Sequence, residues 1–181
     1  YGFNLVYSGN FTAMAECDFN ATTRFVMGIN PTDFSWKLEP GAMFDTPEAV
    51  MVYTDHGLGE MSRIFHRFYN RNLIRGRWKN EKRPLLINNW EGTYFDFNTE
   101  KLVAFAETAK ELGIEMLVMD DGWFGKRNDD FAGLGDYNVN KKKLPHGMDG
   151  LAERIRKKGL DFGLWFEPES VNVDSDLYRA H

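Results

Sequence analysis

The stretch MLVMDDGW (Met116 to Trp123) decides the fold, because an apolar run stands directly before two carboxylates, a glycine and an indole. A near-continuous apolar strand is typical of a parallel sheet covered on both faces. Asp120 and Asp121 then stand at the carboxyl end of that strand, and parallel architectures carry their functional groups at this end.

Strand and helix patterns alternate on both sides of this stretch. LLINNW (85–90) precedes it and LDFGLWFE (160–167) follows it as further strands. Asn98 is expected to cap a helix that ends at Gly113, and Asp149 a second helix that ends at Gly159. The order is therefore βαβαβ.

The phrase Gly113-Ile114-Glu115 returns as Gly159-Leu160-Asp161, one strand-plus-helix unit later. Such a repeat is typical of an α/β barrel or a doubly wound sheet. A dinucleotide-binding sheet requires a glycine fingerprint after its first strand, and NNWEGTYFD is not one. The prediction is the first three βα units of a (β/α)8 TIM barrel.

The first part of the chain has a different pattern. Short alternating segments separated by turn formers predict antiparallel strands, interpreted as the end of an N-terminal β-sandwich; they are FNLVYSG, TTRFVMGI, FSWKLEP and AVMVYTD. Apolar residues recurring every three or four positions from Gly57 to about Ile74 predict one amphipathic helix. The expected domains are the sandwich part (1–56), a helical linker (57–83) and the barrel part (84–181).

Composition excludes several classes of protein. The 181 residues are 43% hydrophobic and 27% charged, as in a globular domain, and the net charge of -5 without basic blocks argues against nucleic acid. No apolar run approaches the roughly 20 residues of a spanning helix. The single Cys17 forms no internal disulfide and fits a reducing compartment, so a cytoplasmic location is expected. Because the chain starts without Met and already alternates apolar with polar residues, it is expected to be a piece of a longer protein.

Each predicted parallel strand ends on a carboxylate and an indole. The groups are Trp90 and Glu91 after Asn88 and Asn89, then Asp120, Asp121 and Trp123, then Trp165, Glu167 and Glu169. Two carboxylates at one mouth suit paired sugar hydroxyls, since ionised acceptors make strong hydrogen bonds. Two alternatives stay open: one Asp caps a turn while the other is solvated, or the oxygens bind magnesium or calcium.

Other polar residues give weaker signals. His56, His66, His146 and His181 are scattered, so no histidine-based catalytic triad is predicted. The loop from Phe124 to Pro145 carries KRNDD and NKKK and is expected to be a solvated rim of the mouth. Within it, the residues that could contribute to a lid are Gly133, Gly135 and Tyr137.

Four stretches together resemble the bacterial α-galactosidases of glycoside hydrolase family 36, also called melibiases. They are RPLLINNWEGTYFDFN, LVMDDGWFGKRNDD, LGDYNVNKKKLPHGMDGLAERI and GLDFGLWFEPESVNVDSDLYRAH. The resemblance implies hydrolysis of terminal non-reducing α-D-galactose from α-galactosides of the melibiose and raffinose type. It also implies no cofactor, no metal, and a homo-oligomer such as the tetramers of bacterial relatives.

The resemblance assigns substrate binding to four positions. Asp120 and Asp121 correspond to the pair that binds the 4- and 6-hydroxyls of galactose, and Trp90 and Trp165 line the same pocket, with Glu167 as a neighbour. The family's mechanism is retaining, with a nucleophile and an acid/base about 5 to 5.5 Å apart. Both catalytic Asp residues are expected beyond His181, so the 181 residues alone are predicted to be inactive. The alternatives are a non-catalytic carbohydrate-binding barrel and a metal-dependent TIM-barrel enzyme that uses Asp120, Asp121 and Glu167.

Overall fold

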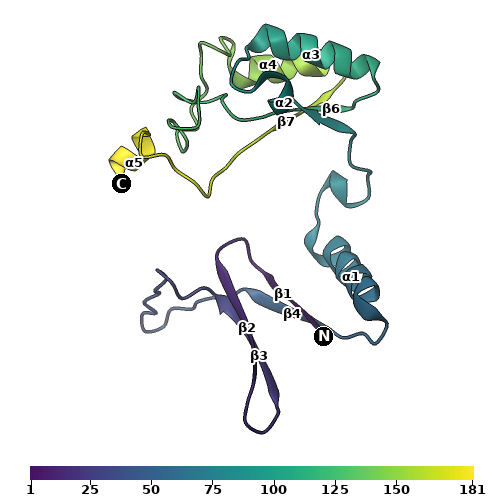
Figure 1. Ribbon diagram of the computed structural model, residues 1–181, viewed down its shortest axis with the longest axis vertical. Helices are drawn as coiled ribbons and strands as arrows, with labels where there is room; N and C mark the ends of the chain where they lie inside the picture. Colours follow the sequence, from purple (N-terminus) through teal and green to yellow (C-terminus); the bar gives the residue numbers. More distant parts are fainter. The chain divides into compact units, whose positions relative to one another are not determined.

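The computed structural model describes residues 1–181, which form two compact units (Figure 1). Unit 1 spans Tyr1–Glu81 and unit 2 spans Lys82–His181. No helix in the chain combines the length and the apolar character needed to cross a membrane.

Unit 1 contains two antiparallel strand pairs. β1 (Gly2–Val6) pairs with β4 (Glu48–Val52), and β2 (Phe11–Cys17) pairs with β3 (Thr23–Ile29). The strand expected within FSWKLEP does not form, whereas β2 forms where the sequence had not suggested one. The difference arises because FTAMAEC finds a partner across a tight turn and FSWKLEP finds none.

One helical segment follows the strands of unit 1. α1 (Gly57–Phe68) continues into the π-helical turn η1 (Tyr69–Leu73), and the short 3-10 helix η2 (Arg77–Lys79) comes next. The predicted apolar stripe of α1 is half-buried except for Leu58, which is exposed. The amphipathic helix expected from Gly57 to about Ile74 is therefore confirmed.

Unit 2 is built on a three-stranded parallel sheet in the order β5-β6-β7. β5 (Leu86–Asn88), β6 (Met116–Met119) and β7 (Asp161–Leu164) are joined by α3 (Thr99–Glu111) and α4 (Gly147–Lys157). Both crossover helices lie on the same side of the sheet (Figure 1). Right-handed crossovers between strands in sequential order produce this arrangement. The short helices α2 (Trp90–Thr93) and α5 (Asp176–Ala180) complete the unit.

The ends of the crossover helices follow local rules with one exception. The Asn98 side chain accepts a hydrogen bond from the Lys101 backbone N–H at 3.0 Å and caps α3. Gly113 and Gly159 adopt φ of 82° and 83°, which glycine tolerates, and they end α3 and α4. Asp149 is not the cap of α4, because the helix begins two residues earlier and places its carboxylate in the first turn.

The core of unit 2 lies between the sheet and its two helices. Leu117 and Met119 of β6 are fully buried beneath apolar residues of both helices, and the helix residues that contribute are Leu102, Val103, Ala106, Ala109, Leu151 and Ile155. Burying the faces of both helices against one central strand holds the carboxyl ends of all three strands at one edge.

Candidate functional site

The polar residues predicted at the strand ends are brought together at the carboxyl edge of the sheet. Asn88 ends β5, Asp120 directly follows β6, and the backbone N–H of Trp165 extends the β7 ladder by donating to Met119 O at 2.9 Å. The sheet thus aligns three segments that are far apart in sequence.

Asp120 is half-buried, and its carboxylate is held by two donors. Its Oδ2 accepts from Asn88 Nδ2, and its Oδ1 accepts from the Asp121 backbone N–H at 2.7 Å. Asn88 is itself oriented, because its Oδ1 accepts from the Trp90 backbone N–H at 2.7 Å. The carboxylate is therefore fixed in place while part of it remains open to solvent.

Asn89 is the residue beneath this arrangement. Its side chain is fully buried, accepts from the Asp120 backbone N–H at 2.8 Å and donates to Thr93 Oγ1 at 2.8 Å. The sequence placed Asn89 at a strand end without distinguishing it from Asn88. The structure separates them, since Asn89 holds the backbone of β6 and Asn88 holds the side chain of Asp120.

Asp121 has a different environment from its neighbour. It is 5% exposed, and Arg127, 4% exposed, donates to both of its oxygens, from Nε at 3.0 and 2.9 Å and from Nη2 at 2.7 Å. Gly122 N–H adds a bond to Oδ1 at 2.6 Å. Asp121 is thus neither a solvated residue nor a plain turn cap.

The expectation that the loop from Phe124 to Pro145 is a solvated rim is wrong for two of its charges. Arg127 is buried against Asp121, and the half-buried Lys143 donates from Nζ to the carbonyls of Phe95, Gly122 and Arg127 at 2.9, 2.8 and 3.4 Å. Burial lowers the pKa of Lys143. The two cations fasten this loop to the end of β6, a role that no local pattern distinguished from solvated charge.

Three indoles stand near the strand ends, and they differ in exposure. Trp90 and Trp165 are half-buried, whereas Trp123 is 3% exposed and donates from Nε1 to Trp165 O at 3.1 Å. Trp90 packs edge-on against Phe95, with ring centroids 5.0 Å apart. Trp123 therefore belongs to the core, and the two partly open indoles are those predicted to line the pocket.

Tyr137 and Glu167 lie close enough to the buried pair for charge to act between them, since Asp121 acts on Tyr137 and Glu167 acts on Arg127. The Tyr137 ring packs among Trp123, Phe124 and Phe166, and its buried hydroxyl lies near the Glu167 backbone without a partner in hydrogen-bonding geometry. Burial, followed by the negative charge of Glu167, raises the pKa of Tyr137. Tyr137 is thus held in place by three neighbouring aromatic rings.

The chain contains no cluster of side chains suited to binding a metal ion. No group of three or more His, Cys, Asp or Glu side chains is placed to hold a metal ion, and this includes the set Asp120, Asp121 and Glu167. All four histidines are exposed. The Arg127 guanidinium occupies the Asp121 oxygens that a cation would need.

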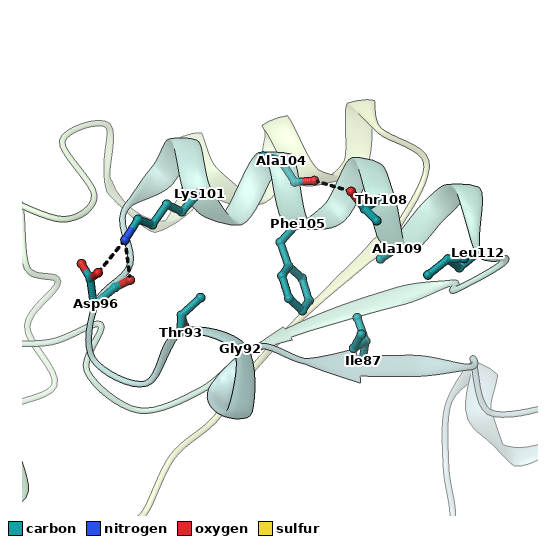
Figure 2. Close-up of a pocket in the computed structure, with 10 residues that line it drawn as sticks. All are labelled: Ile87, Gly92, Thr93, Asp96, Lys101, Ala104, Phe105, Thr108, Ala109 and Leu112. Atoms are coloured by element: carbon teal, nitrogen blue, oxygen red, sulfur yellow. Dashed lines mark hydrogen bonds and ion pairs between the residues drawn. The ribbon is translucent and has the colours of Figure 1, made fainter.

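A cavity of about 650 Å³ lies elsewhere in unit 2, between α3 and the β5–α2 segment (Figure 2). Phe105 points into the cavity from α3. The only ion pair among the residues that line the cavity joins Lys101 to Asp96 at 2.7 Å. Its surface is mainly apolar, and none of the four residues predicted to bind substrate lines it. The candidate site is therefore the strand-end cluster.

Comparisons with known proteins cover the whole chain. Residues 43–181 match the family described as Melibiase, and residues 1–39 match the glycosyl hydrolase family 36 N-terminal domain. The chain is 59% identical over 181 residues to alpha-galactosidase AgaA of Geobacillus stearothermophilus, covering 100% of this chain and 25% of AgaA.

Solved structures show the same likeness. The crystal structure of the family 36 α-galactosidase AgaB from Geobacillus stearothermophilus superposes with a TM-score of 0.85 at 58% identity, covering 99% of this chain and 25% of AgaB. A variant of AgaA from the same organism, solved in complex with raffinose, gives a TM-score of 0.85 at 57% identity with the same coverage. The chain thus spans about a quarter of the length of these relatives.

Proposed function

The chain belongs to glycoside hydrolase family 36, the melibiase family, and we propose that it forms the galactose-binding part of a longer retaining α-galactosidase. The substrate class is α-galactosides with a terminal non-reducing galactose, such as melibiose and raffinose. The raffinose complex of the AgaA variant supports this choice.

The observation that carries the proposal is the presentation of Asp120. Its carboxylate is fixed by Asn88 and by the Asp121 backbone yet remains partly open, at an edge that also holds the half-open Trp90 and Trp165. A fixed carboxylate accepts hydrogen bonds from sugar hydroxyls without first losing freedom, and indole faces suit the C–H surface of a pyranose. Asp120 and Asp121 are proposed to bind the 4- and 6-hydroxyls.

In this proposal the chain orients the sugar and does not break the bond. The nucleophile and the acid/base of a retaining enzyme stand about 5 to 5.5 Å apart on either side of the glycosidic bond. We assign neither role to Asp120 or Asp121, because Asn88 holds one carboxylate and Arg127 the other. Both catalytic groups are proposed to lie in parts of the longer protein outside these 181 residues.

The proposed architecture follows the same logic. Three parallel strands in sequential order with both helices on one face support our proposal of the start of a (β/α)8 barrel. The strand pairs of unit 1 support the proposal that residues 1–56 form the end of a β-sandwich. On kinship we extend the proposal to a homo-oligomer, which size-exclusion chromatography with light scattering tests. The single Cys17 supports a cytoplasmic location, which cell fractionation tests.

The decisive experiment compares the intact protein with the isolated 181 residues. The intact protein is expected to hydrolyse p-nitrophenyl α-galactoside and to release galactose first as the α anomer, as seen by NMR, since two inversions retain configuration. The isolated residues are expected to show no turnover. Turnover by the isolated piece, or binding of galactosides by the intact protein without hydrolysis, contradicts the proposal; the second outcome supports a carbohydrate-binding barrel.

A further inference from the structure

Sugar binding by Asp121 does not by itself explain why its carboxylate is buried against Arg127. Both side chains are almost completely removed from water. Removing two charges from water carries a penalty that their mutual attraction often does not exceed, so stability by itself is a weak reason for such a pair. Its position directly beside Asp120 suggests a role in the site.

The Arg127 guanidinium joins three segments of unit 2. Nε and Nη2 form a fork on the Asp121 carboxylate, while Nη1 donates to Asn172 Oδ1 at 3.1 Å and to Ala132 O at 3.3 Å. Asn172 Oδ1 also accepts from the Leu134 backbone N–H at 2.9 Å. The end of β6, its following loop and the segment after β7 therefore share one cation.

We propose that Arg127 is a positioning residue for galactose recognition, which sets the orientation of the Asp121 carboxylate beside Asp120; this inference rests on the function proposed above. A carboxylate has about four acceptor sites. Three donors occupy most of them: Gly122 N–H bonds Oδ1, Arg127 Nη2–H bonds Oδ2, and Arg127 Nε–H is shared between the two oxygens. About one acceptor site is left, and the planar fork determines the direction in which it points.

Charge supports the same role. Two adjacent carboxylates repel each other, and a guanidinium on one of them halves the net negative charge at the strand end. Burial opposes the charge on Arg127, but the hydrogen bonds and charge of Asp121, with Asp130 and Glu167, outweigh it and raise the Arg127 pKa. Arg127 stays cationic throughout the working range of a galactosidase, so its hold on Asp121 is constant.

The test replaces the fork by a point charge in the intact protein. Arg127→Lys keeps the cation but loses the bidentate geometry. We expect kcat/KM for p-nitrophenyl α-galactoside to fall by at least about tenfold, the scale of one good hydrogen bond. With one of the 4-deoxy and 6-deoxy analogues the fall should be less than about threefold, because the hydroxyl that Asp121 contacts is already missing.

Arg154→Lys is the matched control. Arg154 forms an equally bidentate pair with Glu100, at 2.5 and 2.7 Å, between α4 and α3, and neither residue contacts Asp120 or Asp121 through a hydrogen bond. It should leave kcat/KM unchanged within about twofold for all three substrates, as expected for an exposed pair.

A second variant tests the same role in case the Arg127→Lys protein does not fold. Asn172→Ala removes one of the two partners of Nη1 and leaves the fork on Asp121, so it should show the same selective loss at a smaller magnitude. An equal loss on all three substrates in both folded variants, or no loss in either, overturns the positioning role while the wild type remains active. If the wild type cleaves no α-galactoside, the proposed function fails and this inference fails with it.

Discussion

Replacing Asp120 by asparagine removes one charge and keeps the shape of the side chain, so it tests the carboxylate itself. In the wild type Asp120 Oδ2 accepts from Asn88 Nδ2 and Oδ1 accepts from the Asp121 backbone N–H. The backbone donor is fixed, so the amide oxygen of the variant must face it. The new NH2 group then faces Asn88 Nδ2, and two donors oppose each other.

The magnitude follows from these contacts. Asn88 cannot turn its amide without losing the 2.7 Å bond from the Trp90 backbone, so at least one hydrogen bond of about 1 kcal/mol is lost. A neutral acceptor in place of a charged one weakens a bond to a sugar hydroxyl by about 1–1.5 kcal/mol. Together the loss is about 2–2.5 kcal/mol, which is roughly a 30- to 70-fold fall in kcat/KM.

The assay is steady-state hydrolysis of p-nitrophenyl α-galactoside by the intact protein. We expect kcat to fall and KM to rise, since hydroxyl contacts that tighten in the transition state contribute to both. Glu111→Gln is the control, because it removes the same charge from an exposed residue. Glu111 is the last residue of α3, at the end of the helix away from the β5–α3 connection. A kcat/KM within about threefold of wild type, in a variant that melts like wild type, refutes the assignment of Asp120 as a galactose ligand.

Three further predictions concern the surroundings of the pair. In the intact protein Gly122→Ala should lower the melting temperature more than Gly113→Ala. Both glycines have a positive φ, but a Cβ at Gly122 would lie 2.8 Å from Phe95 Cδ1, whereas a Cβ at Gly113 would meet nothing within 4 Å. Equal shifts in melting temperature would contradict this close packing at Gly122. Tyr137→Phe should be neutral or stabilising by up to about 1 kcal/mol in denaturant unfolding, because it removes a buried hydroxyl without a partner. Because burial raises the pKa of Tyr137, the folded protein keeps the phenolic proton to a higher pH than the unfolded chain does. The wild type should therefore lose stability relative to this variant as the pH rises above about 10. A difference in unfolding free energy that stays constant between about pH 8 and 10.5 would argue against the burial of the hydroxyl. Dialysis of the intact protein against EDTA should leave galactoside hydrolysis unchanged, because a retaining mechanism that uses two carboxylates requires no metal ion; a loss that Mg²⁺ restores would favour the metal-dependent alternative.

Local patterns predicted most of the second unit. The apolar run before Asp120, the cap at Asn98 and the glycines after both helices each act within a few residues, so they can be recognised without knowing the partners of the segment. Asp149 shows the limit of this approach, because α4 begins after His146, whose side chain makes no capping hydrogen bond, so no capping residue marks the true start of the helix.

Pairing in the first unit was harder to predict. FSWKLEP alternates apolar and polar residues more strictly than FTAMAEC, yet only FTAMAEC becomes a strand. A strand is stable only when its backbone N–H and C=O groups find a partner, and alternation alone does not show whether a partner exists.

The candidate site divides along the same line. The sequence by itself determined that Asp120, Asp121, Trp90 and Trp165 would follow three neighbouring strands, since the periodicity of each element is a local property of the chain. Only the tertiary structure decided that Asp120 stays partly open while Asp121 is buried on Arg127. The environment of a charge depends on which distant segments pack around it, and in KRNDD the buried cation and the solvated charges have the same local pattern.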